Sequence, residues 1–266
     1  MPYADNDGTK IYWEERGSGD PLLLIMGLGY TLEMWHRTMP ALAEHYTVIA
    51  FDNRGVGRSD VPPGPYNIPT MASDAAAVMD AAEIDAAHVF GVSMGGMIAQ
   101  EFALRYPGRV RSLVLGCTTC GGPRASAADP EVINALLARA TMSVEEAINV
   151  MAHYVYDAAT PRERLEEDFE IRRRTYPSSE GYLAQLRGVL GWESFGRLSE
   201  IAAPTLVIHG ESDRLVPPAN GELLAESIAG ARLVMLPAAS HIFMTDQTEA
   251  ANQAILSFLA SNDKQS

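Results

Sequence analysis

One serine has the local sequence of a hydrolytic nucleophile. Ser93 is the centre of Gly91-Val92-Ser93-Met94-Gly95, which has the G-x-S-x-G pattern of a nucleophile elbow. In such an elbow a strand ends, the chain turns sharply and a helix begins. Glycines two residues before and two after the serine let the strand and the helix approach closely. The same pattern can arise by chance in a glycine-rich loop, so its flanks decide between the two interpretations.

The flanking sequence favours the elbow. The short apolar run 87–90 precedes the motif and predicts a strand, and the segment 96–104 has an apolar face at helical spacing. Tyr106-Pro107-Gly108 then ends that helix. A serine hydroxyl is a weak nucleophile unless a base lies beside it. The chain must therefore supply a base, and an acid that orients the base.

Candidates for both partners follow in the order Ser, Asp, His. Asp213 comes after the β-branched run 204–209, which predicts a buried parallel strand. A carboxylate just past the C-terminal end of such a strand points toward the crevice where ligands bind. His241 follows the strand predicted at 231–236 and can act as a general base. Glu211 is the nearest rival acid, and Asp213 could instead cap a helix or a turn.

Three further segments make the pattern more specific. The segment 51–59 contains a D-x-R-G-x-G-x-S loop, and the segment 210–217 reads G-x-x-D-x-x-V-P. The third segment, 26–29, reads Met-Gly-Leu-Gly. Together with the elbow, these motifs resemble those of the cap-bearing α/β-hydrolases of the esterase, enol-lactonase and cofactor-free haloperoxidase group. The resemblance covers nearly the whole chain.

The resemblance implies an α/β fold, with a mostly parallel sheet, helices on both faces and a helical cap insertion. It also implies an oxyanion hole that is formed by the backbone N–H groups of Leu28 and Met94. Met26 stands where the family usually has a histidine. The two backbone donors do not depend on that side chain.

Alternation of strand and helix patterns independently predicts a mostly parallel sheet. From about residue 121 to 197 the strand patterns stop and four helical stretches appear. Three of them begin with capping signals, which lie at 129–130, 143–146 and 160–163. We therefore expect residues 1–120 and 198–266 to form the α/β-hydrolase core and residues 121–197 to form the cap.

The cap should cover Ser93 and select the substrate. The expected wall of the pocket consists of large apolar and aromatic side chains from the cap and the core: Leu28, Trp35, Met142, Met151, Tyr154, Tyr182, Trp192, Val216, Ile242 and Phe243. Any of these side chains could instead pack inside the cap or the core, because methionine-rich helices more often fill space than shape a pocket.

Composition is that of an acidic globular enzyme. The 266 residues carry a formal net charge of −14, and 47% of them are hydrophobic, enough for one large domain. A negative surface repels phosphate backbones, which excludes nucleic acid as an expected partner. We find neither a signal peptide nor an apolar run of transmembrane length, so we expect a cytoplasmic protein without membrane contact.

Two cysteines form the only other suggestive motif, Cys117-Thr118-Thr119-Cys120. A redox pair or half of a zinc site would fit C-x-x-C. No second cysteine pair exists, so we favour two small apolar groups that line the site or the core. H-E-x-x-H and a G-x-G-x-x-G that opens a βαβ unit are also missing from the sequence, and we expect no metal and no organic cofactor.

The sequence thus predicts a serine hydrolase that cleaves a small or medium, largely apolar carboxylic ester or lactone through an acyl-enzyme. Three alternatives use the same framework. In a cofactor-free perhydrolase or haloperoxidase, peroxide replaces water. A carbon–carbon bond hydrolase would use the same triad, and a small-molecule receptor would keep the triad but signal by movement of the cap. The expected partner is the small-molecule substrate, and a homo-oligomer is possible.

Overall fold

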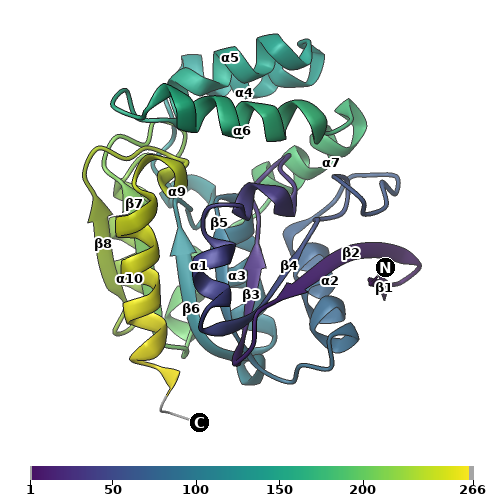
Figure 1. Cartoon of the computed structure of the whole chain (residues 1–266), viewed down its shortest axis with the longest axis vertical. Helices are drawn as coiled ribbons and strands as arrows, with labels where there is room; N and C mark the ends of the chain where they lie inside the picture. Colours follow the sequence, from purple (N-terminus) through teal and green to yellow (C-terminus); the bar gives the residue numbers. More distant parts are fainter. Residues whose placement is uncertain (1, 264–266) are drawn as a thin grey trace.

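The computed structural model describes residues 2–263, in which eight strands form one sheet with helices packed around it (Figure 1). The strands lie in the order β1-β2-β4-β3-β5-β6-β7-β8. β2 pairs with β1 and with β4 in antiparallel fashion, and every other pair is parallel. The strands are β1 (Tyr3–Asn6), β2 (Thr9–Arg16), β3 (Asp20–Ile25), β4 (Tyr46–Phe51), β5 (Ala87–Val92), β6 (Val110–Gly116), β7 (Thr205–Gly210) and β8 (Arg232–Leu236). The predicted fold class is confirmed.

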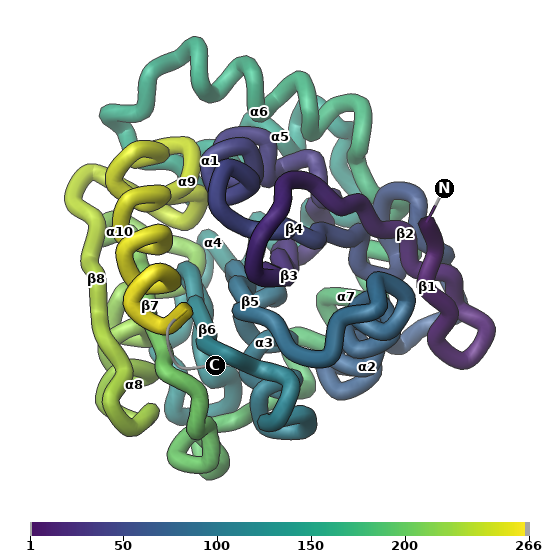
Figure 2. The backbone as a smooth tube through the Cα atoms, turned by 60° about the horizontal axis from the view of Figure 1, so that its bottom comes forward, coloured from purple at the N-terminus to yellow at the C-terminus, as the bar shows by residue number. Residues whose placement is uncertain are grey.

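Helices cover both faces of this sheet. In Figure 2 the strands run from β8 at the left to β1 at the right, with α1, α9 and α10 on one side and α2, α3 and α8 on the other. The helices are α1 (Met39–Ala43), α2 (Ile68–Ala81), α3 (Met94–Arg105), α4 (Pro130–Ala138), α5 (Val144–Val155), α6 (Arg162–Arg174), α7 (Ser179–Leu190), α8 (Ala219–Ser227), α9 (Phe243–Asp246) and α10 (Thr248–Ala260). None of the helices among residues 2–263 is both long enough and apolar enough to cross a membrane.

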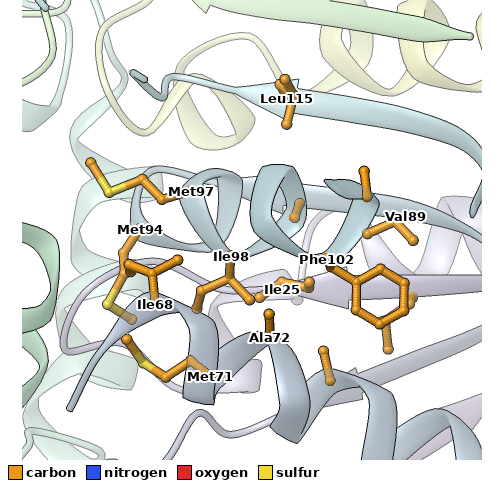
Figure 3. Packing of buried hydrophobic residues seen from close by; sticks show 14 of the residues in the cluster. Ile25, Ile68, Met71, Ala72, Val89, Met94, Met97, Ile98, Phe102 and Leu115 are labelled. Atoms are coloured by element: carbon orange, nitrogen blue, oxygen red, sulfur yellow. The ribbon is translucent and has the colours of Figure 1, made fainter. Parts of the chain in front are cut away.

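The central strands are apolar on both faces because each face meets a layer of helices. In β3, Leu22 and Leu24 belong to the core under α1 and α10, whereas Leu23 and Ile25 belong to the core under α2 and α3. Figure 3 shows the second core, where Phe102 and its neighbours on α3 pack between α2 and the sheet. Burial of each such side chain contributes about 1.5–3 kcal/mol. The sheet is therefore a rigid support for the loops at the ends of its strands.

Helices α4 to α7 form an insertion between β6 and β7, within the stretch 121–197 where the sequence predicts a cap. In Figure 1, α4, α5 and α6 lie together at one end of the sheet. The predicted capping box at the start of α5 is present, because Ser143 and Glu146 each bond the other's backbone N–H group.

The insertion leaves and re-enters the core at a single place. Gly121 and Glu193 form an isolated antiparallel bridge, and the Ser194 amide donates to the Cys120 carbonyl at 2.8 Å. The two ends of the insertion therefore lie side by side on the core.

Candidate active site

Ser93 lies in a strained turn between β5 and α3. Its φ of 55° and ψ of −123° are rarely adopted by a residue other than glycine, at a cost of about 1–3 kcal/mol. The neighbouring glycines are required by space. A Cβ at Gly91 would lie 2.1 Å from the Gly95 carbonyl oxygen, and a Cβ at Gly95 would lie 2.0 Å from that of Ile25. The sequence thus folds locally as the elbow motif predicts.

His241 and Asp213 meet beyond the ends of β8 and β7. His241 Nδ1 lies 2.8 Å from Asp213 Oδ2. The other oxygen of Asp213 accepts the Leu215 and Val216 amides at 2.9 and 2.8 Å. An ionised carboxylate can only accept, so Nδ1 carries the proton and Nε2 of a neutral His241 is free to take one.

Two histidines stabilise the charge of Asp213. Its carboxyl group is buried, which opposes ionisation, but His241 and His209 outweigh this and lower the pKa of Asp213 below its ordinary value. His209 Nε2 lies 3.3 Å from Asp213 Oδ2 and 2.8 Å from the Val216 carbonyl oxygen. His209 is a fully buried residue of β7, and its contact with the acid could not be read from a strand pattern.

Ser93 and His241 line the same cavity, which has a volume of about 190 Å³. No hydrogen bond joins Ser93 Oγ to His241 among residues 2–263, and such bonds often tighten only when substrate binds. Leu28 and Met94, whose amides were expected to bind an oxyanion, also line this cavity. Neither amide donates to another residue in the described part of the chain, so both donors are available to a ligand.

Side chains from two distant segments hold the loop that carries Leu28. Asn53 donates its Nδ2–H to the Met26 carbonyl at 2.9 Å. Gln185, on α7 of the insertion, accepts the Gly29 amide at 2.9 Å and donates to the Arg54 carbonyl at 2.7 Å. The insertion therefore shapes the loop directly. Sequence reasoning missed Gln185, because nothing in a helix pattern indicates what its buried face touches.

The cavity is walled mainly by apolar side chains. Of the residues that were expected to form the wall, Leu28, Met151, Val216 and Ile242 lie in its lining. The other lining residues are Met26, Gly27, Tyr30, Met34, Val92, Met97, Cys117, Thr118, Thr119, Leu136, Arg139, Val155, Val189, Leu215 and Met244.

Six expected wall residues do not line the cavity. Two are core residues of the sheet face under α1 and α10. Trp35 packs on Phe90 with ring centroids 5.0 Å apart, and Phe243 packs against Gly116. Met142 is half-buried just after the 3-10 turn Arg139–Thr141 that follows α4, and it does not line the cavity.

The remaining three bind polar partners. Trp192 donates its indole N–H to Glu101 on α3 at 3.0 Å, and Tyr182 donates its hydroxyl to the Leu136 carbonyl at 2.8 Å. The ring of Tyr154 lies under the Arg214 guanidinium at 5.0 Å.

The two cysteines are free and buried, and Cys117 lines the cavity. Burial and the nearby charge of Asp213 raise the pKa of the Cys117 thiol well above its ordinary value. Burial also raises the pKa of Cys120. Both thiols are therefore protonated and unreactive at neutral pH, as small apolar groups would be.

Comparison with known proteins identifies the family. A family model described as the alpha/beta hydrolase fold matches residues 20–247. The chain belongs to this family.

Relatives extend the likeness over nearly the whole chain. The chain is 33% identical over 268 residues to RutD of Azorhizobium caulinodans, a protein named for carbamate hydrolysis. The match covers 99% of this chain and 100% of that protein. The chain is 34% identical over 242 residues to a poly(3-hydroxyalkanoate) depolymerase of Ectopseudomonas oleovorans, with 90% and 84% covered. Among solved structures, the enol-lactonase from Burkholderia xenovorans LB400 has a TM-score of 0.87 at 29% identity, covering 97% of this chain and 100% of that one. The protein is therefore a hydrolase of this fold.

Proposed function

We propose that the protein is a serine hydrolase that cleaves a small or medium, largely apolar carboxylic ester or lactone through an acyl-enzyme. The observation that carries the proposal is the 2.8 Å contact of Asp213 with His241, whose ring lines the same apolar cavity as Ser93. A cavity of about 190 Å³ favours a substrate smaller than a typical drug-sized ligand.

In the proposed mechanism, Ser93 Oγ attacks the substrate carbonyl carbon while His241 Nε2 takes the hydroxyl proton. The amides of Leu28 and Met94 stabilise the negative oxygen of the tetrahedral intermediate. The Met94 amide is at the N-terminus of α3, where the helix dipole favours negative charge. His241 gives its proton to the leaving alcohol. A water molecule then attacks the carbonyl carbon of the acyl-enzyme while His241 takes a proton from that water. His241 returns the proton to Ser93 Oγ as the carboxylic acid is released.

Relatives support an acyl carbonyl as the reacting centre. The names of three relatives refer to a carbamate, a polyester and an enol-lactone, and each of these contains a carbonyl carbon bonded to a leaving oxygen or nitrogen. The apolar lining favours an ester or lactone over a highly polar substrate.

A panel of p-nitrophenyl esters and lactones of graded length tests this proposal. Ser93→Ala should lower kcat by about 10⁶, because the members of a triad act as a unit. Ser261→Ala, which removes an exposed serine at the end of α10, is the matched control and should keep full activity. Mass spectrometry after treatment with an organophosphate should place the adduct on Ser93. An adduct on another residue, or an active Ser93→Ala variant, would contradict the assignment.

A further inference from the structure

A buried arginine lines the cavity that holds Ser93 and His241. Arg139 follows the last residue of α4, in the short 3-10 turn Arg139–Thr141, and is only 3% exposed. It is the one residue with a permanent charge among those that line the cavity in the described part of the chain. A charged group in an otherwise apolar binding site is costly to bury, so it requires a reason.

The contacts of Arg139 are to neutral groups only. Its Nε lies 3.3 Å from the Tyr176 hydroxyl, and its Nη2 lies 3.4 Å from the Gly29 carbonyl oxygen. Both bonds are long for a guanidinium donor. Its Cζ also lies 5.1 Å and 4.7 Å from the ring centroids of Tyr30 and Tyr182. No carboxylate oxygen of residues 2–263 lies within 4.0 Å of the guanidinium.

The other two buried arginines among residues 2–263, Arg54 and Arg172, differ from Arg139 in their partners or in their position. Arg54 forms two bonds of 2.6 Å with Asp74. The guanidinium of Arg172 has no hydrogen-bond partner among residues 2–263, and its Cζ lies 5.4 Å from the ring centroid of Tyr30. Arg172 does not line the cavity, however, so its charge does not face the space beside Ser93. Arg139 is thus a buried cation that faces the cavity without a counter-charge. An anion that approached Arg139 with good geometry would offset the cost of burying this cation.

Arg139 lies beside the loop that carries one of the two predicted oxyanion donors, the Leu28 amide. Gly29 directly follows Leu28, and a Cβ at Gly29 would lie 3.1 Å from Arg139 Nη2. The guanidinium therefore packs on the loop whose Leu28 amide faces the cavity. An anion bound there would be part of the same molecule whose carbonyl group reaches Ser93.

We propose that Arg139 binds a carboxylate of the substrate, so that the preferred substrate is an ester or lactone that also carries a free carboxylate. The planar guanidinium suits a carboxylate because two parallel N–H groups can bind its two oxygens. A short apolar chain between the carboxylate and the scissile carbonyl would contact the methionine and leucine side chains of the wall. This proposal rests on the proposed serine hydrolase function.

Pairs of substrates that differ only in charge test the proposal. One member is the p-nitrophenyl monoester of a dicarboxylic acid from adipic to suberic acid, a range that avoids the shorter diacids whose monoesters cyclise readily. In the other member an isopropyl group replaces the free carboxylate and keeps its shape. The wild-type protein should have the higher kcat/KM with the anionic member of at least one pair.

Arg139→Met should lower kcat/KM for that anionic ester by about 10² to 10³-fold, which is typical for loss of one partner of a buried charge pair. The neutral ester should change by less than about threefold, and Arg139→Lys should keep part of the preference. Arg172→Met is the matched control, because it removes a second buried guanidinium beside Tyr30 outside the cavity. It should leave the ratio between the two esters unchanged.

The opposite results would overturn the proposal. If wild type does not prefer any anionic ester, or if Arg139→Met slows both esters equally, Arg139 only supports the structure. If Arg139→Met does not fold, calorimetric binding of hexanoate and hexanamide to the Ser93→Ala variant decides. Hexanoate should bind more tightly, and equal binding would contradict a carboxylate site. Failure of the hydrolase proposal is distinguishable, because then neither ester is cleaved and Ser93 is not labelled.

Discussion

Asp213 is fixed in place by four groups that approach it from different directions. Two backbone amides bind one of its oxygens, while His241 and His209 lie against the other. Such a carboxylate cannot rotate without losing several charge-assisted bonds at once. The imidazole of His241 therefore has one preferred orientation, beside the cavity that His241 and Ser93 both line.

Replacement of Asp213 should show what this orientation contributes. In Asp213→Asn, the amide N–H would force the proton of a neutral His241 from Nδ1 to Nε2, which then cannot accept the serine proton. We expect kcat to fall by about 10⁴ with the fold preserved. Glu211→Gln removes the rival acid, whose side chain is exposed, and should remain active. Esterase kinetics and circular dichroism of both variants would check this, and the reverse pattern would assign the role to Glu211.

At the scale of elements, the site is assembled from loops that end strands and from helices of the insertion. Asp246, on α9, connects the two. Its carboxyl group accepts the Ser240 amide at 2.7 Å, beside His241, and binds Thr160 Oγ1 at 2.6 Å in the loop between α5 and α6. The loop that carries the predicted base is thereby tied to the insertion.

Burial raises the pKa of Asp246 to about 6, from 3.8 for an unperturbed carboxyl. Between these two values the folded protein binds more protons at this site than the unfolded chain. The contribution of Asp246 to the free energy of unfolding must therefore fall as pH rises from about 4 to about 6, by about 3 kcal/mol, and then level off. The difference in Tm between wild type and Asp246→Asn, in which other titrating groups cancel, should decrease over that window. A flat or rising difference would contradict the raised pKa.

Elements also explain what could be predicted from the sequence. Ser93, Asp213 and His241 could be selected as candidates because each follows the end of a predicted strand, and parallel strands bring such ends together. Trp192 was expected in the wall for its size, yet its position is set by a bond to Glu101, far away in sequence. Arg139 and Gln185 were missed because their roles depend on which face of a helix meets the core. Only tertiary packing decides that.

At the scale of the whole molecule, the chain has a net charge of −14, whereas the one permanently charged residue among the described residues that line the cavity is the cation Arg139. Long-range repulsion should oppose the approach of an anionic ester, while the short-range pair with Arg139 favours its binding. The two effects differ in their response to salt. Charges in water are screened within about 10 Å at 0.1 M ionic strength, and buried pairs are screened much less.

We therefore expect kcat/KM for the anionic ester to rise a few-fold between low salt and about 0.1 M ionic strength, because screening weakens the repulsion more than the buried contact. The neutral isopropyl ester should hardly change. Steady-state kinetics at several concentrations of sodium chloride would measure both. A fall for the anionic ester would mean that its binding depends on exposed cations.

The bridge between Gly121 and Glu193 has a consequence for how such a chain can diversify. The first and last residues of the segment 121–193 are paired with each other on the core. Insertions, deletions or replacement of this whole segment can therefore leave the strand pairing of the sheet unchanged. Two contacts with the core restrict such an exchange. Gln185 accepts the Gly29 amide, and Trp192 donates to Glu101 on α3. A transplanted segment that lacked the glutamine would leave the loop before Gly29 without its support. We therefore expect substitutions in α4 and α5, which contribute residues to the cavity lining, to change the substrate range most readily, provided that Gln185 on α7 is kept.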